Sequence, residues 1–327
     1  MPDYHPGELE VQTRAGVQTG AARIGKSIRS TIPLAAQTFL QDQRMIIVST
    51  VDWEGRAWAS MLTGEPGFLK TPDEETVEIN AAPHPSDPLC ENLHVGGAIG
   101  MIAIDFETRR RMRVNGHVKS ERRNIVVHTD QVYANCPKYI QARVLQTEGT
   151  DERSSSIPHL RQCTTQAENL VHASSSAQAI RQEELTPEQG AWIERADTFF
   201  IASCHRDGGC DASHRGGPPG FVRIESATRL VFPDYSGNRM FQTLGNISVE
   251  PHAGLLFLDF ESGDTLQLSG KAQVIWERER VAAFAGAERL IEFVIDRVVE
   301  IKGASSLRWQ FVQYSPFLPG PTQSVSL

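Results

Sequence analysis

The feature that most constrains the fold is an internal repeat. Residues 46–68 align without a gap on residues 199–221, and residues 100–118 align on residues 254–272, at offsets of 153 and 154 residues. Identical positions include Gly55 and Gly208, Ser60 and Ser213, Gly64 and Gly217, Phe68 and Phe221, Gly100 and Gly254, Asp105 and Asp259, and Gly116 and Gly270. Because two blocks recur in the same order at almost the same spacing, the sequence predicts a duplicated domain.

Each copy is expected to contain a short helix followed by several short antiparallel strands. The run Thr186-Pro187-Glu188-Gln189 combines the hydroxyl cap, first-turn proline and Gln that begin a helix, and Pro33 begins the equivalent segment of the first copy. Apolar, β-rich runs joined by polar turns follow in both copies, at residues 45–51, 101–106, 112–114, 198–204, 255–260 and 266–268. Many short strands with few long helices indicate a mainly β fold with a small barrel in each copy.

The repeat also predicts the domain organisation. We expect an N-terminal arm at residues 1–32, a first barrel at 33–140, a linker at 141–185, a second barrel at 186–303 and a tail at 304–327. The linker is rich in Ser, Thr, Gln and Glu, which favours a connection or a partly helical excursion. Prolines break the tail, so irregular structure is expected there.

Composition limits the partners. The net charge of −8 over 327 residues argues against a protein that binds nucleic-acid backbones, and no apolar run is long enough to cross a membrane. No secretory signal is evident at the N-terminus, so a cytoplasmic location is expected.

The five cysteines are odd in number and lack the paired spacing of metal sites, which favours a reduced set. Cys204 and Cys210 flank a predicted turn, so a cross-strand disulfide is geometrically conceivable, but in a cytoplasmic chain the reduced form is the expectation. Cys136, which precedes a proline, is expected to be a small buried hydrophobe rather than a redox thiol.

Several segments spread over nearly the whole chain resemble one protein family. They are His5-Pro6-Gly7-Glu8, Asp87-Pro88-Leu89, and residues 58–68, 108–116, 135–141, 213–217, 233–238 and 241–246. Together they resemble the pyridoxamine 5′-phosphate oxidase-like, FMN-binding split-barrel family, and more closely its tandem-domain branch of flavin-nucleotide-binding proteins. The resemblance implies a mainly β (α+β) fold of two tandem split β-barrels with short flanking helices, which form a pseudo-dimer with FMN in the groove between them.

The resemblance assigns the FMN phosphate to the second copy. A phosphate with nearly two negative charges needs guanidinium groups, hydroxyls and N–H donors. The expected cofactor-binding residues of this copy are Ser213, His214, Arg215, Asp234, Tyr235, Ser236, Asn238, Arg239, Gln242, Thr243 and Gln267. Asn238 and Arg239 replace the Arg-Lys pair that is usual in the family. Met61 and Leu62 occupy the places of His214 and Arg215 in the first copy, so its own phosphate site is expected to be lost.

The first copy is expected to cover the flavin ring with Arg111, Arg113 and Lys138. Arg111 and Arg113 share one face of an alternating strand, and in the family this face meets the flavin of the partner barrel. An arginine near the ring would stabilise the negative charge of reduced flavin. One FMN per chain is therefore predicted.

The implied function is an FMN-dependent oxidoreductase that acts at flavin N5 on a small-molecule substrate, with electrons from NAD(P)H or a separate reductase. Two alternatives stay open. One is a flavin-nucleotide carrier without turnover, and the other is a heme-binding protein that would use His84, His94, His214 or His252. Because one chain supplies both barrels, either a monomeric pseudo-dimer or a homodimer satisfies the sequence.

Overall fold

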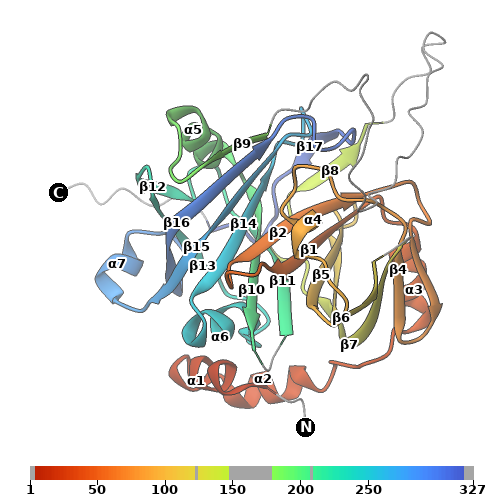
Figure 1. The fold of residues 1–327 in the computed structure, drawn as a ribbon. Coiled ribbons are helices and arrows are strands. Elements are labelled where there is room, and N and C mark those ends of the chain that lie inside the picture. Colours follow the sequence, from red (N-terminus) through yellow and green to blue (C-terminus); the bar gives the residue numbers. More distant parts are fainter. Residues whose placement is uncertain (1–3, 122–123, 147–178, 207–208, 320–327) are drawn as a thin grey trace.

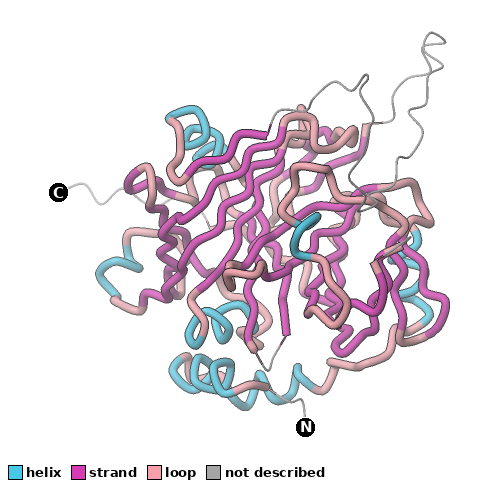
Figure 2. The backbone as a smooth tube through the Cα atoms, in the orientation of Figure 1, coloured by secondary structure: helices cyan, strands magenta, loops and turns pink. Residues whose placement is uncertain are grey.

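A computed structural model describes residues 4–121, 124–146, 179–206 and 209–319 (Figure 1). Strands outweigh helices, and the helices are short, as Figure 2 shows. The helices are α1 (Pro6–Arg14), α2 (Gln18–Gly25), α3 (Leu34–Gln41), α4 (Leu89–Asn92), α5 (Pro187–Arg195), α6 (Gln242–Val249) and α7 (Arg278–Ala282). The predicted mainly β class is confirmed, whereas closure of each copy into a barrel stays a prediction.

Two large antiparallel sheets repeat one topology. The first contains β1 (Met45–Val51), β2 (Ala57–Thr63), β3 (Leu69–Asp73), β4 (Thr76–Ile79), β5 (Ala98–Asp105), β6 (Arg110–Ser120) and β7 (Ile125–Asn135). The second contains β10 (Thr198–His205), β11 (Gly209–Gly216), β12 (Arg223–Ser226), β13 (Arg229–Asp234), β14 (His252–Leu258), β15 (Thr265–Ile275) and β16 (Arg289–Ile301). Their orders are β2-β1-β5-β6-β7-β4-β3 and β11-β10-β14-β15-β16-β13-β12. Strands that correspond in the repeat therefore hold the same place in both sheets.

The helix predicted from the Thr186 cap is confirmed. The Thr186 side chain accepts the Gln189 N–H, and the Gln189 side chain accepts the Thr186 N–H, so α5 begins with a capping box. In the first copy α3 begins after Pro33, as the sequence predicts.

Three features differ from the sequence predictions. The linker supplies β8 (Ala142–Leu145) and β9 (Ala179–Gln182), while its residues 147–178 lie outside the described part of the chain. The tail supplies β17 (Trp309–Gln313), which pairs with β8, so irregular structure throughout the tail was the wrong expectation. Trp309 explains the difference, because its buried ring packs with Phe106 and Phe260.

The third difference is a disulfide between Cys204 and Cys210. The two residues are directly opposite in the register of β10 and β11, with a Cα–Cα distance of 4.1 Å, so strand pairing brings the sulfurs together. The expectation of a reduced set was therefore wrong for this pair. Cys136 keeps its thiol, and Cys163 lies outside the described residues.

The two sheets pack against each other around a shared apolar core. Buried side chains from both copies meet there, among them Ile47, Ile102, Phe200 and Leu256. Glycines allow the close approach at two corresponding places: Gly254 of β14 lies against the carbonyl of Ala57, and Gly100 of β5 lies against the carbonyl of Cys210. Because Gly100 and Gly254 correspond in the repeat, as do Ala57 and Cys210, these contacts are related by pseudo-twofold symmetry.

We expect Gly254→Ala to destabilise the protein by about 1–3 kcal/mol, because the added Cβ would lie 2.6 Å from the Ala57 carbonyl oxygen and would force the sheets apart. Chemical denaturation measures this change. Gly190→Ala is the matched control, since its Cβ would meet nothing within 4 Å in helix α5 and should stabilise slightly. Equal stability of the Gly254→Ala variant and the wild type would contradict the packing argument.

Candidate functional site

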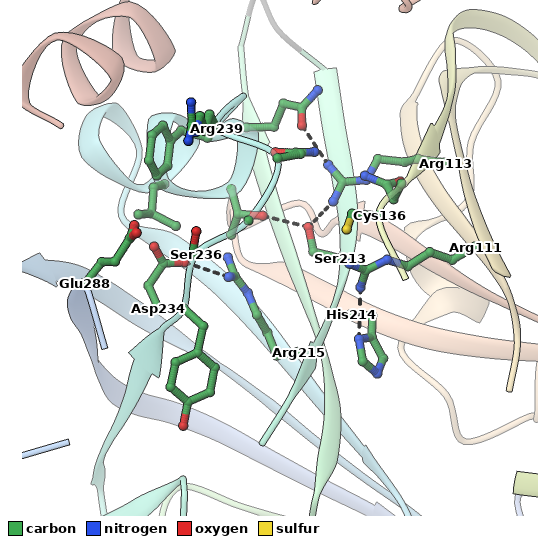
Figure 3. Close-up of a pocket in the computed structure, with 18 of the residues that line it drawn as sticks. Arg111, Arg113, Cys136, Ser213, His214, Arg215, Asp234, Ser236, Arg239 and Glu288 are labelled. Atoms are coloured by element: carbon green, nitrogen blue, oxygen red, sulfur yellow. Dashed lines mark hydrogen bonds and ion pairs between the residues drawn. The ribbon is translucent and has the colours of Figure 1, made fainter. Parts of the chain in front are cut away.

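A cleft opens where β6 of the first sheet meets β11 of the second (Figure 3). Arg111 and Arg113 reach into it from β6, whereas Ser213, His214 and Arg215 come from β11. The segment after β13 and the first turn of α6 complete the wall with Asp234, Tyr235, Ser236, Asn238, Arg239, Gln242 and Thr243. Twelve of the fourteen residues predicted from the sequence thus lie together.

Arg113 forms the floor of this cleft and ties the two copies together. Its Nη1 donates to the Tyr133 hydroxyl at 2.9 Å, to Asp211 Oδ1 at 3.1 Å and to Gln242 Oε1 at 3.2 Å, and its Nη2 donates to Ser213 Oγ. Ser213 Oγ also bonds Thr243 Oγ1 at 2.7 Å. Arg113 is only 6% exposed, so its charge is held by fixed protein partners.

Arg111, two residues earlier on the same strand face, lacks such a partner. Its Nη1 donates to His214 Nδ1 at 3.0 Å, and its Nε has no hydrogen-bond partner among the described residues. Burial, followed by repulsion from Arg113, lowers the pKa of Arg111 to about 9. A buried guanidinium without a carboxylate is a strong attraction for an anion.

His214 is a neutral hydrogen-bond donor. Burial and the neighbouring Arg111 guanidinium hold the pKa of His214 well below its ordinary value, so the ring is uncharged at neutral pH. Because Nδ1 accepts the bond from Arg111, the ring proton is assigned to Nε2. That Nε2 is buried and has no partner among the described residues, so its N–H requires an acceptor.

Arg215 and Asp234 form an ion pair on the opposite wall, with Nη1 and Oδ1 2.7 Å apart. Arg289 also binds Asp234, through Nη2 at 2.8 Å and Nε at 3.0 Å. Arg215 Nε has no partner among the described residues, which leaves a third unpaired N–H group near the cleft.

The charged groups of the cleft do not balance. Its lining among the described residues holds four arginines and two carboxylates, namely Arg111, Arg113, Arg215, Arg239, Asp234 and Glu288. With His214 neutral, two positive charges remain in excess. The next neighbours, Asp211 and Arg289, cancel each other. A ligand with about two negative charges would therefore neutralise the site.

Gln267 and Lys138 do not reach this cleft. Gln267 corresponds to Arg113 in the repeat and lies in the pseudo-equivalent groove, where its Nε2 donates to Ser60 Oγ at 3.1 Å and to Asp87 Oδ2 at 3.2 Å. Lys138 instead places its Nζ 5.7 Å from the centre of the Phe317 ring. The sequence analysis assigned both residues to the FMN site from their positions in the repeat or in a motif. Such a position does not fix the direction in which a side chain points.

The structure adds cleft residues that the sequence analysis did not select. Cys136 lines the cleft and is half-buried, so the expectation that it is buried was wrong. Tyr139 contacts the wall, since its hydroxyl donates to the Ser236 carbonyl at 3.1 Å. Both lie in the 135–141 motif, which was the available signal, whereas nothing marked Val17 of the N-terminal arm.

Among the described residues, no group of three or more His, Cys, Asp and Glu side chains is arranged to hold a metal ion. No helix in this part of the chain has both the length and the apolar character needed to span a membrane.

A comparison with protein-family models matches one part of the chain. Residues 185–309 match the family model described as pyridoxamine 5′-phosphate oxidase. The matched segment is the copy that supplies β11, β13 and α6. A search of curated proteins found no match.

Solved structures with some likeness each cover about a third of this chain. HupZ of Group A Streptococcus is 15% identical over 35% of this chain and 91% of its own, with a TM-score of 0.30. A putative pyridoxamine 5′-phosphate oxidase from Lactobacillus delbrueckii is 16% identical over 36% and 94%, with a TM-score of 0.31. An F420 reductase is 12% identical over 35% and 95%, with a TM-score of 0.26.

The excess positive charge predicts opposite effects of Arg111→Gln with and without an anion. Without a ligand, this variant should be about 1–2 kcal/mol more stable than the wild type at neutral pH, because a cation with a lowered pKa costs stability below that pKa. Millimolar inorganic phosphate should raise the melting temperature of the wild type more than that of the variant.

Differential scanning calorimetry measures both effects. Arg297→Gln is the matched control, since Arg297 is exposed and pairs with Glu183 away from the cleft. A destabilised Arg111→Gln protein that keeps the full phosphate response would contradict the unpaired-charge interpretation.

Proposed function

We propose that the protein binds one FMN per chain in this cleft and uses it as the redox cofactor of an oxidoreductase that acts on a small molecule. The observation that carries the proposal is the excess of two positive charges in a cleft built by both copies. A phosphate monoester carries about −1.5 to −2 charge at neutral pH, so its charge matches that of the cleft.

The unpaired polar atoms fit the same ligand. Arg111 Nε, Arg215 Nε and His214 Nε2 are N–H donors without acceptors among the described residues. FMN offers phosphate oxygens, ribityl hydroxyls and ring carbonyls as acceptors. Arg215, Ser213 and Ser236 would hold the phosphate on the second copy, while Arg111 and Arg113 would face the ring from the first copy.

The bound flavin would supply hydride and electron transfer, which no side chain of this cleft performs by itself. The chain's own contribution is binding and electrostatics. Arg113 is fixed by four side chains, so its charge is in place before a ligand arrives. A fixed positive charge beside the ring would favour the anionic reduced form.

The two alternative functions share this site. A flavin carrier would use the same arginines without turnover, so only an activity measurement separates it from an enzyme. For the heme alternative, His214 is the one histidine of His84, His94, His214 and His252 that lines the cleft in the described part of the chain. Because Nε2 holds the ring proton and Nδ1 accepts from Arg111, heme iron could bind Nε2 only after the proton moved to Nδ1 and the Arg111 bond broke.

The purified protein should absorb near about 450 nm or bind added FMN with saturation, and Arg215→Gln should weaken FMN binding by about tenfold or more through loss of charge-assisted hydrogen bonds. Fluorescence quenching of FMN measures the dissociation constant. Arg297→Gln should bind as the wild type does. Absence of both the absorbance and saturable binding would contradict the proposal, and a Soret band with hemin alone would favour heme.

Anaerobic addition of NADH or NADPH to the FMN-loaded protein tests turnover. Bleaching of the flavin band by either nucleotide, followed by recovery on addition of an oxidant, is expected of an oxidoreductase that takes electrons directly. A loaded protein that neither nucleotide nor an added flavin reductase can reduce would instead be a carrier.

A further inference from the structure

The His5-Pro6-Gly7-Glu8 motif of the N-terminal arm begins helix α1. His5 Nδ1 accepts the Gly7 N–H at 3.2 Å, and the His5 N–H donates to Glu8 Oε2 at 2.8 Å, so both ends of the motif cap the helix. The motif is remote in sequence from every cleft residue of the second copy. Neither the proposed FMN-binding residues nor the internal repeat explains why this motif is present.

The arm docks on the second copy through two glycines. Helix α1 lies directly beneath α6 at the bottom of the view in Figure 1. A Cβ on Gly7 would meet the Gly245 carbonyl and the Val249 side chain, and one on Gly245 would lie 2.6 Å from Glu8 N. Gln12 adds a bond from its Nε2 to the Met240 carbonyl at 3.0 Å. The helices therefore approach closely enough to bury Glu8, which is 5% exposed.

A continuous chain of hydrogen bonds leads from this arm to Arg113. Because His5 Nδ1 is an acceptor, its proton lies on Nε2, which donates to Asn246 Oδ1 at 2.9 Å. Asn246 Nδ2 donates to Asp211 Oδ2 at 2.9 Å. Asp211 Oδ1 then accepts from Arg113 Nη1 at 3.1 Å and from Asn115 Nδ2 at 2.7 Å. The carboxyl group of Glu8 meets this chain at His5, where Glu8 Oε2 lies 3.7 Å from His5 Nε2.

Burial, and then the negative charge of Asp211, raise the pKa of Glu8 to about 8. Several titratable or charged side chains surround Glu8, and they come from the elements packed around it. They are Tyr4 and His5 of the arm, Asp211 of β11, Arg113 of β6, Tyr133 of β7 and His205 of β10. The His205 ring stacks on that of His5. Helix α6 contributes no charged side chain. At neutral pH Glu8 is protonated, and among the described residues Asp211 is the one carboxylate that pairs with Arg113.

We propose that Glu8 is a positioning residue of the cleft: its carboxyl group, placed beside the Asp211–Arg113 pair by the docked arm, sets the affinity for an anionic cofactor. This inference rests on the proposed binding of FMN. Ionisation of Glu8 places a second carboxylate next to Arg113 and reduces the positive excess at the cleft from two charges to one. The cleft then attracts a dianion less strongly, although no cleft residue has changed.

The test compares Glu8→Gln, which keeps the size and hydrogen bonding of the side chain but cannot ionise, with the wild type. Glu10→Gln makes the same chemical change on the exposed face of α1 and serves as the matched control. The dissociation constant of FMN is measured at about pH 7 and about pH 9, because the phosphate is fully ionised over this range and its charge stays constant.

Arg111, whose pKa is about 9, loses part of its charge at the higher pH in every variant, so all three proteins should bind FMN more weakly there. The loss of affinity should be about threefold or more greater for the wild type and Glu10→Gln than for Glu8→Gln, which has no carboxyl group to ionise at this position. In the ligand-free protein the folded state holds the Glu8 proton more tightly than the unfolded state, so stability falls as the pH rises from 4.5 to about 8 and the loss is complete above that. The melting temperature of Glu8→Gln should therefore gain on that of the wild type up to about pH 8 and then run parallel to it.

A Glu8→Gln protein whose FMN affinity falls with pH as the wild type does would overturn the inference and leave FMN binding intact. A wild type that binds no FMN at either pH would overturn the proposed function instead. The change in affinity for inorganic phosphate between the two pH values then decides the role of Glu8, because the ionisation of phosphate and of Arg111 is common to the wild type and Glu8→Gln. A smaller loss of affinity in Glu8→Gln supports the role, and an equal change in both proteins overturns it.

Discussion

The buried ion pair between Arg113 and Asp211 is the interaction on which the rest of the site depends. It joins β6 of the first copy to β11 of the second in an interior where both residues are at most 6% exposed. Removing one partner of such a pair typically costs about 3–5 kcal/mol, because the other charge stays buried and unpaired. The pair therefore fixes how the two sheets meet, and it places the floor of the cleft at their junction.

Divergence of the two copies explains why the molecule has one such junction instead of two. Ser60 and Ser213 are equivalent, and each bonds a side chain from the other copy. That side chain is Arg113 at one groove and Gln267 at the other. Gln267 donates to the buried Asp87, whose pKa is raised by burial, so a neutral amide stands here where the other groove has a guanidinium. Met61 and Leu62, both buried, stand where the other groove has His214 and Arg215.

The N-terminal arm adds to the difference between the two grooves. Although it precedes the first copy in sequence, it packs on α6 of the second and reaches Asp211 through His5 and Asn246. The pseudo-equivalent groove has Asp87 and the turn of α4 near its serine instead. Duplication supplied two similar grooves, and one arm per chain supports only the groove with the arginines.

The sequence alone determined the duplication, the mainly β class, the helix starts at Pro33 and Thr186, and most of the cleft residues. These follow from local rules: repeat offset, cap chemistry and the alternation that puts Arg111 and Arg113 on one strand face. The strand at 309–313, the Cys204–Cys210 disulfide and the places of Gln267 and Lys138 were decided only by tertiary structure. Each of these features depends on which distant segment of the chain lies opposite. The raised pKa of Glu8 depends on this too, because it comes from burial under α6 and not from the position of Glu8 in its motif.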